Sequence, residues 1–267
     1  MFGAARLNTL AKAAAAAAPT YAVSFDGTGD GYYANLAGSG TTGTDSKYLT
    51  FACTFYWGGG SNLQHLANLR LGDLSASQYG FWVWINGGRM QCKMSGGDGS
   101  NPTSIYETTE NSLTTNAWNQ VVIYWDTTSY TTNTKIYING TSKAISNEST
   151  PNVNWNWGCP TSDGTSFIKV GRPNAGQTGD GVDFNGNIAQ LYIHGVSGAP
   201  TISNYWDSAS SKPKNLGTQG TATGLARPYI YHYGDTTTFP TNNGTGFSSY
   251  TMILQGNIAT VSGPTYA

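Results

Sequence analysis

The chain has 267 residues, a formal net charge of −1 at pH 7 and only 10% charged residues, against roughly 25% in an average globular domain. Such a weak overall charge excludes a broad electrostatic attraction to nucleic acid or to an anionic membrane, and we expect neither as a partner. The length and the 35 glycines are typical of one large all-β domain, in which tight turns join many short strands.

The first predicted element is an N-terminal arm over residues 1–20. Arg6 to Ala18 form an alanine-rich, helix-prone run, and Pro19 ends it because proline cannot continue a helix. A secretory signal is the alternative, but the middle of the run is alanine rather than a more apolar Leu- or Val-rich region. A short helix is marginal in water, so we expect a retained arm, helical or extended, that docks on a neighbouring subunit. Its expected anchors are Phe2, Arg6, Leu7 and Leu10.

From Tyr21 onward, apolar and polar residues alternate with a period of two, which is typical of half-buried antiparallel strands. The clearest case is Lys47 to Trp57, where alternate side chains share a face that should meet a core. That face carries Leu49, Phe51, Cys53, Phe55 and Trp57. Further strands are predicted at residues 81–85, 89–94, 118–125, 134–138, 167–170 and 187–194.

Two Asn-Gly pairs predict hairpins between these strands. Asn86-Gly87 follows FWVWI and Asn139-Gly140 follows KIYI, and both residue types tolerate the positive φ angles of a two-residue hairpin loop. Hairpins imply antiparallel pairing. Many short strands at this spacing favour a two-sheet sandwich or jelly roll over a parallel sheet, which would need crossover helices.

Several of these segments together resemble the concanavalin A-like, laminin G-like jelly roll. They are the stretches WNQVVIYWD (118–126), KIYING (135–140), VGR (170–172) and FNGNIAQLYIH (184–194). The resemblance covers residues 21–205 and implies an all-β, antiparallel two-sheet sandwich. Its motifs are signatures of a fold rather than of an activity.

Residues 206–267 lie outside that family pattern. They are predicted to form a Ser-, Lys- and Gly-rich linker and a C-terminal β extension with one or two strands, one of them Tyr250 to Leu254. The segment RPYIYHYGDTTTFPTNNGTG resembles C-terminal segments of structural proteins from tailed phages. The N-terminal segment MFGAARLNTLAK resembles the start of some virion proteins from phages. A packed extra strand and loop is the alternative for this region.

No pattern of catalytic residues emerges, and we expect the protein not to be an enzyme. Polysaccharide hydrolases of this superfamily use two glutamates in an E-x-D-x-x-E motif, which is missing here. The glutamates are Glu107, Glu110 and Glu148, and the first two are interpreted as solvated residues of a polar, loop-like segment. No two histidines lie close together in the sequence, where they occur as His65, His194 and His232. His194 ends a strand and is expected at the surface or half-buried.

Metal binding has one candidate position. Asp180 and Asp183, in GDGVDF, are candidate calcium ligands at the rim of the jelly roll, but two acids in a glycine-rich loop are better explained by ordinary turn capping. We therefore expect no cofactor. Cys53, Cys92 and Cys159 are odd in number and lack a C-x-x-C spacing, so we interpret them as buried thiols rather than as disulfides or zinc ligands.

Aromatic residues are the remaining candidates for recognition. Trp155 and Trp157, in PNVNWNWGCP, share one side of an extended segment and form a possible platform for stacking on a sugar ring. Packing of both rings in the core is the alternative.

These observations lead to two functional hypotheses. The first is a non-catalytic virion structural protein, a capsid decoration or cement subunit at the virion surface, whose partners are capsid or tail subunits and copies of itself. In that role the arm and the C-terminal residues would bind other subunits. The alternative is a lectin-like carbohydrate-binding module of a phage tail or fibre that contacts host surface glycans.

Overall fold

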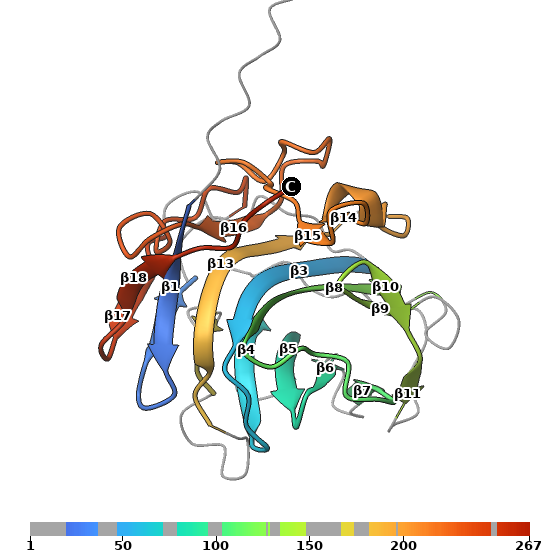
Figure 1. Cartoon of the computed structure of the whole chain (residues 1–267), viewed down its shortest axis with the longest axis horizontal. Coiled ribbons are helices and arrows are strands. Elements are labelled where there is room, and N and C mark those ends of the chain that lie inside the picture. The colour runs from blue at the N-terminus through green and yellow to red at the C-terminus, as the bar shows by residue number, and fades with distance from the viewer. Residues whose placement is uncertain are drawn as a thin grey trace, which may run out of the picture.

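The computed structural model folds the chain into an antiparallel β-sandwich of two sheets (Figure 1). It describes residues 20–36, 47–71, 79–95, 103–126, 128, 134–147, 167–173, 182–195, 197–246 and 250–267. The all-β, two-sheet antiparallel architecture predicted from the sequence is confirmed. The predicted arm lies outside the described residues, apart from Thr20, and so do its expected anchors Phe2, Arg6, Leu7 and Leu10.

The first sheet is built around two long strands, β3 and β13, which pair with each other. Its members, in spatial order, are β10 (Thr141–Lys143), β9 (Lys135–Ile138), β8 (Ala117–Asp126), β3 (Tyr48–Trp57), β13 (Asn185–His194), β1 (Tyr21–Asp26) and β18 (Ala259–Ser262). An eighth strand, β16 (Ile230–Tyr233), also pairs with β13.

The second sheet also has eight strands and faces the first across the core. Its order is β11 (Ile145–Asn147), β7 (Thr103–Thr108), β6 (Arg89–Ser95), β5 (Tyr79–Asn86), β4 (Leu63–Leu71), β12 (Phe167–Val170), β2 (Gly31–Asn35) and β17 (Ile253–Gln255). The named strands of both sheets pair antiparallel, and the hairpin connection β5–β6 agrees with the predicted antiparallel pairing.

The core lies between the inner faces of the two sheets. It is formed by the side chains that point inward, which are every second residue along each strand. The predicted inner face of β3 is confirmed, because its five apolar side chains are all buried in the main cluster. Facing residues of the second sheet include Phe81, Val83 and Ile85 of β5. The buried, free thiols of Cys53 and Cys92 agree with their interpretation as small apolar core residues, while Cys159 lies outside the described part of the chain.

The central part of the outer face of the first sheet, around Ala52, Val122 and Tyr192, is buried as well, which the sequence did not predict. Residues after 197 cross this face, and Figure 1 shows them in orange and red beside β3 and β13. Tyr205, Leu216 and Tyr231 pack there as a second apolar cluster against Ala52 and Tyr192 of the sheet. The Tyr231 hydroxyl donates to the Gly217 carbonyl (2.8 Å), so the polar end of this buried ring is satisfied.

Residues 206–267 thus differ from the predicted linker with one or two strands. They contain β14 (Trp206–Asp207) and β15 (Lys212–Pro213), which form a separate two-stranded sheet, and β16, β17 and β18, which join the two large sheets. The predicted strand 250–254 is shifted, since β17 begins at Ile253. A short 3₁₀ helix, η1 (Ile202–Asn204), precedes them. Across the described ranges, no helix has the length and apolar character needed to span a membrane.

The two predicted hairpin loops have different outcomes. Asn139-Gly140 is confirmed, because Ile138 pairs with Thr141 and both loop residues have positive φ angles of 50° and 76°. Asn86-Gly87 is wrong by one position. Asn86 pairs with Arg89, and the loop is formed by Gly87 and Gly88, whose φ angles are 56° and 91°. Two glycines meet the demand for positive φ with less strain than Asn does.

Two long strands of the second sheet were not predicted. In β4, the pairing with β5 shifts between His65 and Ala67, and this irregularity breaks the alternation that would identify a strand. In β7, the last two residues, Glu107 and Thr108, belong to the polar segment 107–110 that the sequence analysis interprets as loop-like. Its partner β6 has Met90, Cys92 and Met94 in the core, so β7 extends a sheet whose inner face is already apolar.

Candidate functional site

Residues 197–246 pack on the first sheet, whereas the outer face of the second sheet carries buried outward side chains, such as Asn68 and Trp82, beside half-buried ones, such as Tyr33 and Lys169. Strand register aligns five of its outward side chains into one line, here called the transverse row. It consists of Tyr33, Lys169, Asn68, Trp82 and Lys93, contributed by β2, β12, β4, β5 and β6. Their neighbours along each strand are core residues, so alternation directs these five outward.

One end of the transverse row is an aromatic pair around a lysine. The rings of Tyr33 and Phe167 lie 6.0 Å apart, and Lys169 Nζ lies 5.8 Å from the first ring centre and 5.3 Å from the second. All three side chains are half-buried. Burial, followed by the nearby charge of Arg172, lowers the pKa of Lys169. The ammonium is therefore held in cation–π geometry in a partly desolvated position.

The other end of the row repeats this combination. Lys93 Nζ lies 5.2 Å from the ring of Trp82, which is itself buried. Between the two lysines, Asn68 is fully buried and its Nδ2 donates to the Arg172 carbonyl (2.7 Å). The amide of Asn68 is thereby fixed in orientation.

A second line of outward residues runs beside the first. His65, Trp84, Gln91 and Glu107 follow one another across β4, β5, β6 and β7. Asn68 Oδ1 lies 3.0 Å from His65 Nδ1, and because the Asn68 amide nitrogen already donates elsewhere, the imidazole nitrogen is the donor. Trp84 Nε1 donates to Gln91 Oε1, and the His65 and Trp84 rings lie 5.8 Å apart. This line is a connected polar and aromatic network.

Glu107 corrects an expectation from the sequence. It was interpreted as a solvated loop residue, but it lies in β7, is 8% exposed and sits 3.7 Å from Arg89. Strand β7 was unrecognised, and this is why the burial of Glu107 was missed. Glu110 agrees better with the prediction, because its side chain is 63% exposed, with its carboxylate 3.1 Å from Lys143 Nζ. Glu148 lies outside the described residues.

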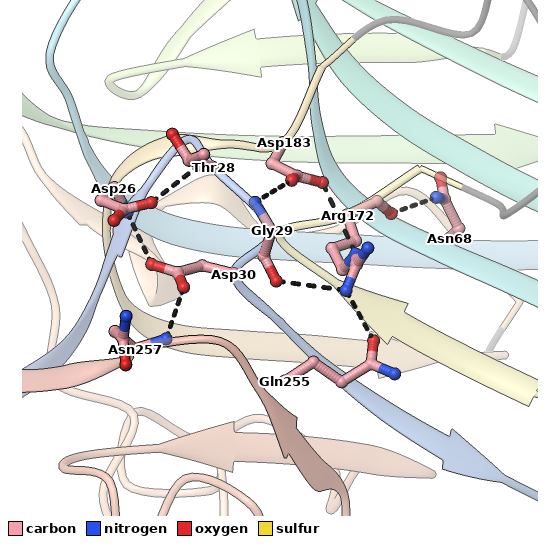
Figure 2. Close-up of polar contacts among 9 residues, drawn as sticks. All are labelled: Asp26, Thr28, Gly29, Asp30, Asn68, Arg172, Asp183, Gln255 and Asn257. Atoms are coloured by element: carbon pink, nitrogen blue, oxygen red, sulfur yellow. Dashed lines mark hydrogen bonds and ion pairs between the residues drawn. The ribbon is translucent and has the colours of Figure 1, made fainter.

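The rim next to the transverse row contains the candidate calcium ligand Asp183 (Figure 2). Asp183 Oδ2 accepts from the Gly29 amide (2.5 Å), and its Oδ1 lies 3.6 Å from Arg172 Nε. Arg172 Nη1 donates to the Gly29 carbonyl and to Gln255 Oε1, both at 3.1 Å. The arginine therefore connects the β1–β2 loop, the segment before β13 and strand β17.

Asp30 forms a second connection at this rim. Its Oδ1 accepts from the Asn257 amide (2.6 Å) and its Oδ2 from the Asp26 amide (3.0 Å), as Figure 2 shows. The carboxylates of Asp30 and Asp183 thus accept hydrogen bonds from the chain. Within the described residues, no group of three or more His, Cys, Asp or Glu side chains is arranged to hold a metal ion. The other candidate ligand, Asp180, lies outside those residues, and calcium binding stays a hypothesis.

One histidine lies deeper than expected, and a second is fully buried. His194 was expected at the surface or half-buried, but it is 8% exposed, with its ring 5.1 Å from that of Tyr229. Burial lowers its pKa. The residues after 197 that cross the outer face of the first sheet account for this difference, because the sequence did not predict them there. His232 is fully buried in the sandwich core.

The sequence did not identify the transverse row, and the predicted glycan platform cannot be compared with it. Trp155 and Trp157 lie outside the described residues. The alternation in FWVWI places Trp82 and Trp84 on one face, the same signal that pointed to Trp155 and Trp157. Their partners come from strands far away in the sequence, so the row becomes apparent only once strand order is known.

Comparison with known proteins gives one family match. Residues 26–203 match a family described as the concanavalin A-like lectin/glucanases superfamily. No curated protein matches the chain. Among solved structures, it is similar to a candidate carbohydrate-binding protein from Bacteroides ovatus ATCC 8483, with a TM-score of 0.56 and 16% identity, over 94% of this chain and 62% of that one.

Two further structures are similar at lower scores. Domains LG4-5 of the mouse laminin alpha1 chain give a TM-score of 0.44 and 13% identity, over 68% of this chain and 43% of that one. The CBM40 of the Ruminococcus gnavus IT-sialidase gives a TM-score of 0.44 and 14% identity, over 68% of this chain and 95% of that one. The chain spans less than two thirds of the Bacteroides and laminin chains.

Proposed function

Because the chain belongs to the concanavalin A-like lectin/glucanases superfamily, we propose that it is a carbohydrate-binding protein without catalytic activity. The superfamily includes binding proteins and hydrolases, so the residues of this chain have to distinguish the two. The observation that carries the proposal is the transverse row with Phe167, where aromatic rings and fixed polar groups share the outer face of the second sheet. Aromatic faces pack against the apolar faces of sugar rings, while amides and charged groups bind hydroxyls.

The distribution of carboxylates supports binding rather than hydrolysis. Glycoside hydrolysis commonly needs two carboxyl groups that flank the scissile bond, about 5 to 9.5 Å apart. On the strands of the second sheet, Glu107 is the single acidic residue, and it pairs with Arg89. A lone, ion-paired carboxylate is a poor general acid, because the neighbouring cation favours its ionised form.

The test is glycan binding by the full chain on an array, followed by calorimetry with any glycan that binds. Replacing both Tyr33 and Phe167 by Ala removes the half-buried aromatic pair, and we expect affinity to fall by about tenfold or more, which is about 1.4 kcal/mol. The matched control is Tyr56→Ala with Trp118→Ala, an aromatic pair with a 6.0 Å ring separation on the first sheet. Control affinity should stay near that of the unmodified chain.

Two results would count against this site. Unchanged affinity of the Tyr33 and Phe167 variant would exclude the aromatic pair, provided that circular dichroism shows it folded. Loss of binding only on Trp155→Ala with Trp157→Ala would place the platform on the residues predicted from the sequence. Absence of binding to any glycan would reject the proposed function.

The capsid decoration role, with its phage origin, virion location and capsid partners, stays a prediction based on resemblance at the two ends of the sequence. Residues 206–267, expected to bind other subunits, pair with strands of their own chain through β16, β17 and β18. The capsid hypothesis therefore depends on binding of other subunits by the N-terminal arm, residues 1–20. Deleting residues 1–19 should abolish co-sedimentation with phage heads without lowering the melting temperature, and a truncated protein that still binds heads would contradict it.

A further inference from the structure

The outer face of the second sheet holds two lysines whose charge is not neutralised by an acidic partner among the described residues. Both lie in the transverse row, and both contact aromatic rings. The ion pairs among the described residues are Arg89 with Glu107, Lys143 with Glu110 and Arg172 with Asp183. The one acid on the strands of this face is thus already paired with Arg89, so Lys93 and Lys169 leave the row positively charged.

The surroundings of Lys169 make an added anion favourable. Its side chain is half-buried, and Arg172, itself paired with Asp183, is the nearby charge that acts on it. A partly desolvated cation beside another cation is stabilised by a negative group more strongly than an exposed one is, because the local dielectric is lower. The rings of Tyr33 and Phe167 both contact the ammonium, so an anion bound to Lys169 would lie beside these two rings.

The two lysines are separated in a way that suits an extended ligand. They belong to β12 and β6, and strands β4 and β5 lie between them. Because neighbouring strands are about 4.8 Å apart, the two side chains start roughly 14 Å from each other along the row. A chain molecule with repeated negative groups can reach both, whereas a single small anion reaches one.

We propose that this face selects acidic saccharides, carrying carboxylate or sulfate groups, with Lys169 and Lys93 binding the anions and Tyr33 and Phe167 packing on a sugar ring. The inference rests on the proposed carbohydrate-binding function and specifies its ligand class. The overall charge of the chain is −1, so the selectivity comes from this local surface rather than from a general attraction to anions.

The experiment compares matched acidic and neutral polysaccharides with the full chain. Affinity electrophoresis or calorimetry is run with polygalacturonate against its methyl ester, and with dextran sulfate against dextran. We expect the acidic member of at least one pair to bind about tenfold more tightly or better, and its affinity to fall as salt is raised.

Lysine variants distinguish the site from nonspecific charge. Lys169→Gln and Lys93→Gln should each weaken binding of the acidic polysaccharide several-fold and reduce its salt dependence. Lys135→Gln is the matched control, since it removes the same charge from an exposed position on β9 of the first sheet. Its affinity should stay close to that of the unmodified chain.

The outcomes separate this inference from the proposed function. Binding of neutral glycans that depends on Tyr33 and Phe167, with no preference for acidic ones, overturns the inference and leaves the proposed function intact. Binding of no saccharide at all overturns both. Equal effects of the three lysine variants, or equally tight binding of single-stranded DNA, would show a nonspecific attraction to polyanions and would also overturn the inference.

Discussion

His232 illustrates how the core sets the protonation state of one side chain. The ring is fully buried, its Nδ1 lies 2.7 Å from the Phe239 carbonyl and its Nε2 lies 2.8 Å from the Tyr250 hydroxyl. Nδ1 must carry the hydrogen that the carbonyl accepts, and because burial favours the neutral ring, Nε2 then accepts from the tyrosine. The ring is then neutral with both nitrogens satisfied. Burial lowers its pKa to about 4, against the opposing effect of the backbone contacts at Phe239 and Thr241.

This pKa predicts a loss of stability in mild acid. Above pH 6.5 His232 is neutral whether the chain is folded or not. Between pH 6.5 and about 4 only the unfolded chain binds the proton, so the free energy of unfolding falls, by about 3 kcal/mol in total. His232→Gln should remove the His232 part of this decrease in urea titrations at pH 7 and pH 4.5, while His194, whose pKa is also lowered by burial, still contributes. An equally large decrease in the variant would contradict the assignment.

Asp235 also affects stability in acid, but at a lower pH than His232. Hydrogen bonds, above all from Thr237, lower the pKa of Asp235 to about 2 from a usual value of 3.8. Its stabilising contribution is present above pH 3.8 and is lost as pH falls towards 2. The window of His232 lies above that of Asp235.

At the scale of elements, the segment around β17 and β18 connects the two sheets. β17 pairs with β2 of the second sheet and β18 with β1 of the first. Gly256 joins them with a φ of 81°, and a Cβ there would overlap the Asp30 carboxylate. Only glycine fits this crossing without strain. Arg172 and Asp30 then fix the segment through Gln255 and Asn257.

Two neighbouring residues test whether this segment is part of the core. Met252 is 3% exposed within the main apolar cluster, whereas Ile253 is 64% exposed on β17. Met252→Ala should lower the free energy of unfolding by about 2 to 5 kcal/mol, the usual cost of a large-to-small core substitution. Ile253→Ala should change it by about 0.5 kcal/mol or less. Equal effects in denaturant unfolding would show that the segment does not pack as described.

For the whole molecule, local signals account for what the sequence predicted. Alternation identified the inner face of β3, and the Asn139-Gly140 turn identified a hairpin, because both depend on residues next to each other in the chain. The cover over the first sheet was not predicted, since Tyr205 and Leu216 lie in a Gly- and Ser-rich region without periodicity. The contacts of these residues with the first sheet join segments that are distant in the sequence, so no local pattern predicts them.

The candidate site was harder to predict than the fold. Its residues lie on five strands from Tyr33 to Lys169, and their common line depends on the spatial order β2, β12, β4, β5, β6. The sequence drew attention to Trp155 and Trp157 because they are close together. A binding surface made across a sheet brings together residues that are separated along the chain, so reasoning from nearby motifs overlooks it.

The pairing of β1 with β18 and of β2 with β17 also affects how the protein is synthesised. Asp30 and Asn257, which share a hydrogen bond, are 227 positions apart. At roughly 5 to 20 residues per second, a ribosome needs roughly 10 to 50 s between them. Throughout that interval β1 and β2 lack β18 and β17, and for most of it they also lack β13 and β12. An open strand edge readily pairs with another nascent chain. The time between the first strands and the last is therefore the period in which this sandwich is most exposed to aggregation.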